Sequence, residues 1–335
     1  MRYLAFSLIL AVTFPSCNNC DLPTSPSSVG GSPAGRTQVW ITPNVCSRDM
    51  LKLFSEPGKW VQARSKTNVF KFYPYHLGNG PSVCENNTLT NFINIVPGGA
   101  FRWLNKQNPK IEIAIEAASV KAWNCGGRMP DENVSSVSQA IRNIEASGGR
   151  VGYVAMDEPF TAVKSNCKQS SDITARQIKY YIDQLRIRHP GVSVGLIEAY
   201  PYLNTEEIEE GILAIKEAGA NISFLHLDGH RHGALANNDV FGDLRRLKDF
   251  CHKENIDFGV IVWGDDGTSN QGFSNESIMT VATINAAIGA PDHIIFQSWE
   301  SSSGQTLLNP DNLPENQPHT MTWIVNTGLA LLGIR

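Results

Sequence analysis

Two adjacent carboxylates end a short apolar stretch in the middle of the chain. The run Val151–Phe160 reads VGYVAMDEPF, so Asp157 and Glu158 follow a strand-like segment and precede Pro159. A buried strand that delivers acids at its carboxyl end is how a β/α barrel presents catalytic groups. Neighbouring carboxyls can share the work of a general acid and its partner, as in the cleavage of an acetal. The remaining chain must therefore build the barrel.

Eight short apolar or alternating segments supply the expected strands, and a helix-like stretch follows each of them. The strands are expected at Gln38–Pro43, Val69–Tyr75, Ile111–Glu116, Val151–Asp157, Val192–Glu198, Ile222–Asp228, Phe258–Trp263 and His293–Trp299. The clearest helices are expected at Glu132–Ala146, Ile173–Arg188, Glu206–Ala218, Val240–Glu254, Glu276–Ile288 and Thr320–Leu332. This order predicts an α/β fold, a single-domain (β/α)8 TIM barrel. An open doubly wound sheet is disfavoured, because TPNVCS after the first strand is no glycine-rich phosphate loop.

Alternation along these strands predicts which side chains face the barrel mouth. Aromatic rings pack on the C–H faces of sugars, and carboxylates, amides and ammonium groups bond their hydroxyls, so the mouth predicts a carbohydrate partner. For Glu116 and Glu198, an ion pair with Lys71 or an arginine is an equal alternative to substrate binding. The expected substrate-binding residues are Trp40, Asn44, Lys71, Tyr73, Tyr75, Glu116, Trp123, Glu198, Tyr200, Asp228, His230, Trp263 and Trp299.

The tetrapeptide MDEP at the end of the fourth strand resembles the Asn-Glu-Pro of retaining clan A glycoside hydrolases. The wider likeness is to secreted TIM-barrel glycoside hydrolases and covers residues 37–335. It implies that Glu158 is the acid/base. Asp157 replaces the family's asparagine, and the seventh strand ends in VWGDDG, so Asp265 or Asp266 stands where that family has its nucleophilic glutamate.

The same Asp-Glu pair is also similar to that of substrate-assisted hexosaminidases. Under this resemblance Asp157 orients a 2-acetamido group that acts as the nucleophile, and Glu158 protonates the leaving group. Trp123, Trp263 and Trp299 would then surround the acetyl group. The two resemblances leave the catalytic set as Glu158 with either Asp157 or Asp265.

A second cluster offers different chemistry. His226, Asp228, His230 and His232 alternate at the end of the sixth strand segment, and such a set can hold a divalent ion that activates water. Gly229 interrupts the run and Gly233 follows it, which indicates a bend into a loop. We therefore rank this metal-dependent hydrolase below the glycosidase and expect neither metal nor cofactor. The other alternative is a non-catalytic carbohydrate-binding surface lipoprotein.

Composition and the first residues indicate an exported protein. The 335 residues are 41% hydrophobic and carry a formal charge of -4 without a basic run, which argues against nucleic acid as a partner. We expect a signal peptide at 1–16, a flexible Ser/Gly/Pro-rich tether at 17–36 and the catalytic domain at 37–335. Cys17 is either lipidated, which would attach the protein to a membrane, or removed. The protein is expected to be a monomer, secreted or at the cell surface.

Cysteine usage agrees with export. Six cysteines follow Cys17, an even number that suits disulfides in an oxidising compartment, with the pairing open. They are Cys20, Cys46, Cys84, Cys125, Cys167 and Cys251.

Overall fold

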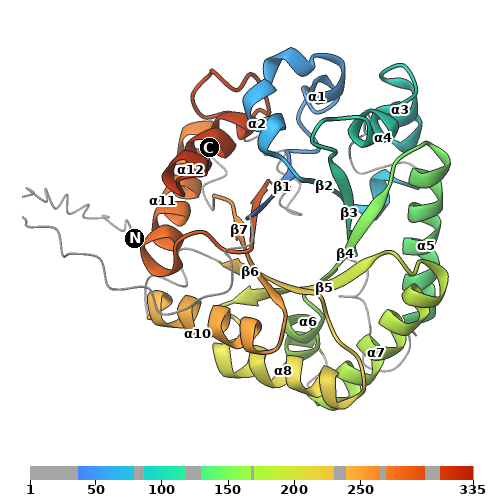
Figure 1. Ribbon diagram of the computed structural model, residues 1–335, viewed down its shortest axis with the longest axis vertical. Helices are drawn as coiled ribbons and strands as arrows, with labels where there is room; N and C mark the ends of the chain where they lie inside the picture. Colours follow the sequence, from blue (N-terminus) through green and yellow to red (C-terminus); the bar gives the residue numbers. More distant parts are fainter. Residues whose placement is uncertain are drawn as a thin grey trace, which may run out of the picture. The chain divides into compact units, whose positions relative to one another are not determined.

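Eight parallel strands close into a barrel in chain order, which confirms the predicted (β/α)8 TIM barrel (Figure 1). The computed structural model describes residues 37–78, 84, 87–117, 130–166, 170–229, 239–264, 269–298 and 310–334. The strands are β1 (Gln38–Thr42), β2 (Val69–Phe72), β3 (Glu112–Ala117), β4 (Val151–Asp157), β5 (Ser193–Tyr200), β6 (Phe224–Gly229), β7 (Asp257–Val262) and β8 (His293–Gln297).

Helices surround the strands, as Figure 1 shows. They are α1 (Lys52–Ser55), α2 (Val61–Lys66), α3 (Leu89–Asn94), α4 (Ala100–Asn105), α5 (Pro130–Ala146), α6 (Pro159–Asn166), α7 (Ser171–Arg188), α8 (Thr205–Glu217), α10 (Val240–Lys253), α11 (Asn270–Ile288) and α12 (Met321–Leu331), with two 3-10 turns, η1 (Pro57–Lys59) and η2 (Pro74–His76). The α8 helix begins with a capping box, in which the Asn204 side chain accepts from the Glu207 backbone N–H and the Glu207 side chain accepts from the Asn204 backbone N–H.

The barrel interior has an apolar layer to which every strand contributes one residue. The alternate strand residues, such as Val39 and Ile41, pack outward against the helices. This division follows from the two-residue period of a strand and confirms the predicted inward direction of Trp40 and Lys71. The layer consists of Trp40, Val69, Ala114, Ala155, Ile197, Phe224, Ile261 and Ile295.

The second strand is shorter than predicted. We expected it to run from Val69 to Tyr75, but β2 ends at Phe72 and Pro74 begins η2. Proline has no backbone N–H to donate to the ladder, so the strand cannot continue through it.

One disulfide joins Cys46 to Cys84, whose Cα atoms are 5.2 Å apart. Such a bond is compatible with an extracellular protein. Cys251 is a buried free thiol in α10, so the six cysteines that follow Cys17 do not all form disulfides. The expected signal peptide and tether, with Cys17 and Cys20, lie outside the described residues, as do Cys125 and Cys167. No described helix combines the length and the apolar character needed to cross a membrane.

Candidate active site

Glu158 occupies the corner at which β4 turns directly into α6. Its backbone N–H donates to the Ile197 carbonyl of β5 at 2.9 Å, and its own carbonyl accepts from Ala162 in the first turn of α6. To make both bonds without an intervening loop, the residue adopts φ 51°, in the left-handed region. A residue with a side chain is strained there, by about 1–2 kcal/mol. Glu158 is half-buried, and Asp157 beside it is only 7% exposed.

Lys71, Glu116 and Gln297 form a buried polar cluster in the barrel interior. The Lys71 ammonium group has no exposed surface and donates to the Glu116 carboxylate and to the Gln297 amide oxygen. The structure thus confirms the ion pair that the sequence left open for Glu116. Gln297 was absent from the predicted site, although the alternation of β8 pointed it inward.

Asp228 lies at the end of β6, where its Oδ1 accepts from Trp263 Nε1 at 2.7 Å. Burial raises the pKa of Asp228 to about 6, and the nearby negative charge of Glu158 adds to this effect. Because this influence declines with distance, it indicates that Asp228 and Glu158 face the same part of the barrel mouth. Asp228 is therefore an acid near Glu158 that would carry a proton under mildly acidic conditions.

Two tyrosines border these acids. Burial raises the pKa of Tyr73 well above its ordinary value, and the carboxylates of Glu116, Asp157 and Asp228 also contribute. Tyr75 stacks on Tyr73 with ring centroids 5.4 Å apart and rings inclined by 15°. Tyr73 is buried, whereas Tyr75 is 42% exposed. The exposed tyrosine gives a flat apolar surface of the kind on which a sugar ring packs.

Several predicted ligands have structural roles instead. Trp40 is fully buried in the interior layer and contacts the rings of Tyr153 and Phe224, so it has no surface for a substrate. The Asn44 side-chain amide donates to the Pro310 carbonyl at 3.2 Å and joins two chain segments. We remove both residues from the substrate-binding set.

The fifth strand also departs from the prediction. Ile197 lies in the interior layer, so Glu198 and Tyr200 point to the helix side. The Tyr200 hydroxyl donates to Asp243 of α10. Glu198 accepts from the first turn of α6 and is 1% exposed, which makes it a structural ligand of the protein rather than of a substrate. Both faces of β5 are apolar, with Val194 and Leu196 toward the helices and Ile197 toward the interior, so the sequence does not show which face Glu198 joins.

Part of the predicted site lies outside the described residues. These residues are Trp123, His230, His232, Asp265, Asp266 and Trp299. His226, from the proposed metal cluster, is buried inside the barrel with its Nε2 atom 3.0 Å from Nδ1 of His293. It is thus a core residue, and the described residues contain no group of three or more potential metal-ligating His, Cys, Asp or Glu side chains.

Comparison with known proteins shows likeness of fold alone. No family model matches the chain, and no curated protein matches its sequence. A glucosidase from Croceicoccus marinus superimposes with TM-score 0.53 at 12% identity, covering 90% of this chain and 69% of that one. Native xylanase 10B from Thermotoga maritima gives TM-score 0.50 at 9% identity, covering 88% and 96%. An aldolase also matches, at a TM-score of 0.43. The chain shares its TIM-barrel fold with the glucosidase and the xylanase.

Proposed function

We propose that this protein is a glycoside hydrolase in which Glu158 is the general acid. The observation that carries the proposal is the left-handed backbone of Glu158 at the carboxyl end of β4. Glycine would adopt this conformation without strain, yet the chain places a glutamate there. Strained residues of this kind cluster at functional sites, and this end of a TIM barrel is where catalytic residues are found.

The chemistry requires a proton donor and a second acid. A protonated carboxyl assists departure of the glycosidic oxygen, while a carboxylate stabilises the oxocarbenium-like centre or attacks it. Glu158 takes the first role in our proposal. Its partner is Asp157 if a 2-acetamido group assists, or Asp265 if a covalent intermediate forms. Asp228 is a third candidate that the structure adds, because its protonation is coupled to the charge of Glu158.

The surrounding residues support a carbohydrate as the substrate. Tyr75 offers an exposed ring backed by Tyr73, and Trp263 stands beside Asp228 at the mouth. Lys71 holds Glu116 and Gln297 in place, so their remaining oxygen and amide groups are pre-arranged to bond sugar hydroxyls. An exported, monomeric enzyme, free or attached through a lipidated Cys17, completes the proposal; we infer no role for nucleic acid.

The test is hydrolysis of aryl glycosides and polysaccharides, with and without 2-acetamido groups, in the presence and absence of a chelator. We expect Glu158→Gln to lower kcat about 10²- to 10⁴-fold, the range for a general acid. Glu112→Gln is the matched control, since that carboxylate begins β3 at the opposite end of the strand and pairs with Arg150 at 3.7 Å. It should keep wild-type activity.

The partner is assigned by Asp157→Asn and Asp228→Asn. Loss confined to acetamido substrates in Asp157→Asn supports the substrate-assisted route, and loss on all substrates in Asp228→Asn supports Asp228. Activity that survives Glu158→Gln but disappears with chelator would refute the acid assignment and favour metal chemistry. Binding of polysaccharide without turnover in wild type would favour the non-catalytic carbohydrate-binding protein.

A further inference from the structure

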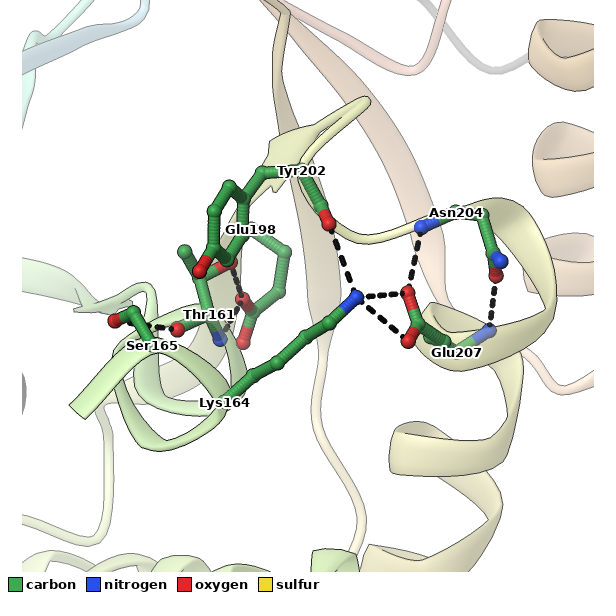
Figure 2. A network of polar contacts seen from close by, with 7 residues as sticks. All are labelled: Thr161, Lys164, Ser165, Glu198, Tyr202, Asn204 and Glu207. Atoms are coloured by element: carbon green, nitrogen blue, oxygen red, sulfur yellow. Dashed lines mark hydrogen bonds and ion pairs between the residues drawn. The ribbon is translucent and has the colours of Figure 1, made fainter. Parts of the chain in front are cut away.

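A buried carboxylate from β5 caps the helix that follows Glu158. Glu198 Oε1 accepts from the Phe160 backbone N–H at 2.9 Å, and Oε2 accepts from the Thr161 N–H at 3.0 Å and the Thr161 hydroxyl at 2.8 Å. Figure 2 shows Glu198 beside Thr161 at one end of this network. The first N–H groups of a helix have no partner within the helix, and a carboxylate satisfies them with charge-assisted bonds.

The same strand holds the residue before the helix. The Ile197 carbonyl accepts from Glu158 N–H, and the next residue of β5, Glu198, holds the N–H groups of Phe160 and Thr161. Two consecutive residues of β5 therefore accept hydrogen bonds from the chain on both sides of Pro159. These hydrogen bonds constrain the direction in which the chain leaves β4, and with it the backbone conformation of Glu158.

We propose that Glu198 is a positioning residue, which keeps Glu158 in its left-handed conformation and so directs the Glu158 carboxyl to the barrel mouth. This inference rests on the proposed function for its catalytic consequence. Its structural part, the hold of Glu198 on the start of α6, is independent of any activity. Glu198 itself touches no substrate, because it lies on the helix side of β5.

Burial and hydrogen bonding act on the Glu198 carboxyl in opposite directions. Burial raises the pKa of Glu198 to about 7, and its hydrogen bonds to Phe160 and Thr161 offset only part of the effect. The charge of Glu158 also raises the pKa of Glu198, so the two side chains are close enough to interact. An apolar residue at this place would avoid the burial cost but would leave the N–H groups of Phe160 and Thr161 without a partner.

The other end of α6 offers an internal control. Lys164 donates to both Glu207 oxygens, at 2.7 and 2.8 Å, and to the Tyr202 carbonyl at 3.2 Å, and Glu207 also bonds Asn204 at the start of α8 (Figure 2). Glu198 and Glu207 are thus two carboxylates that hold the same helix. Only Glu198 does so beside Glu158.

The experiment compares Glu198→Gln with Glu207→Gln by steady-state kinetics and by amide hydrogen exchange of residues 157–166. The glutamine side chain keeps the size of Glu198 but places an NH₂ group against N–H donors. We expect Glu198→Gln to lower kcat about 10- to 100-fold, the effect of a small misplacement of a catalytic group, with KM within about threefold. Exchange at Phe160 and Thr161 should accelerate at least about tenfold, the loss of about 1.4 kcal/mol of protection. Glu207→Gln should do neither.

A second variant tests the same contact in case Glu198→Gln does not fold. Thr161→Val removes the hydroxyl bond to Glu198, together with the 3.4 Å bond that the hydroxyl accepts from the Ala199 N–H, and should give a smaller change of the same kind. Thr161→Ser should retain wild-type kcat. Exchange in Glu198→Gln that is no faster than in Glu207→Gln would overturn the positioning role, as would unchanged kcat in an active enzyme. If wild type is inactive on every glycoside, the proposed function fails, while the exchange measurement still decides the role of Glu198.

Discussion

The buried Lys71–Glu116 pair allows a quantitative test of the barrel mouth. Lys71→Met removes the ammonium group and leaves the Glu116 carboxylate, which is 5% exposed, without its cation. Breaking a buried ion pair on one side costs about 3–5 kcal/mol of the free energy of unfolding, since the remaining charge has lost its partner but stays desolvated. Methionine has a similar length and adds no charge, so the packing loss is small.

The loss should come from the unpaired carboxylate. Adding Glu116→Gln to Lys71→Met removes the buried charge and should recover part of the loss.

Urea unfolding followed by tryptophan fluorescence at one fixed pH provides the measurement. The matched control is Lys216→Met, which breaks a pair with Glu254 at 2.6 Å in which the lysine is 58% exposed. An ion pair whose lysine is solvated in this way contributes little to the free energy of unfolding. If Lys71→Met costs no more than Lys216→Met, or if adding Glu116→Gln recovers none of the loss, the description of a desolvated, mutually dependent pair is wrong.

Two further predictions concern stability. The Cys46–Cys84 disulfide joins two residues 38 positions apart in the sequence. Its removal in the double variant Cys46→Ala, Cys84→Ala should therefore lower the free energy of unfolding by about 4 kcal/mol. A reductant should destabilise wild type equally and leave the double variant unchanged; equal effects on both proteins would contradict this. The pKa of Glu198 is about 7 against an ordinary 4.5, so the folded state holds this proton more tightly and loses stability as the pH rises from 4.5 to 7. Urea unfolding should show that the free energy of unfolding of wild type falls by about 3 kcal/mol relative to that of Glu198→Gln between pH 4.5 and pH 7. If the difference between the two proteins stays constant over this range, the pKa of Glu198 is not raised.

Much of the barrel could be predicted because its rules are local. Each strand is buried on both sides and appears as a short apolar run, and each long helix carries an apolar face. Alternation within β1, β3 and β4 then assigned Trp40, Glu116 and Asp157 to the interior. Where proline interrupted the pattern, at Pro74, a local rule also existed and should have shortened the predicted strand.

The sequence by itself determined the strand order, the fold class and the placement of Asp157 and Glu158 at the carboxyl end of β4, because these depend on periodicity and on adjacency in the chain. Tertiary structure alone decided which acids have which partners. Glu198 appeared to belong with Glu116, yet it lies on the helix side of β5, where it holds α6. Such a bond joins residues 37 or 38 positions apart, and no local pattern encodes it. The register of neighbouring strands is set by packing of the whole barrel, so this part of the site emerges only when the barrel closes.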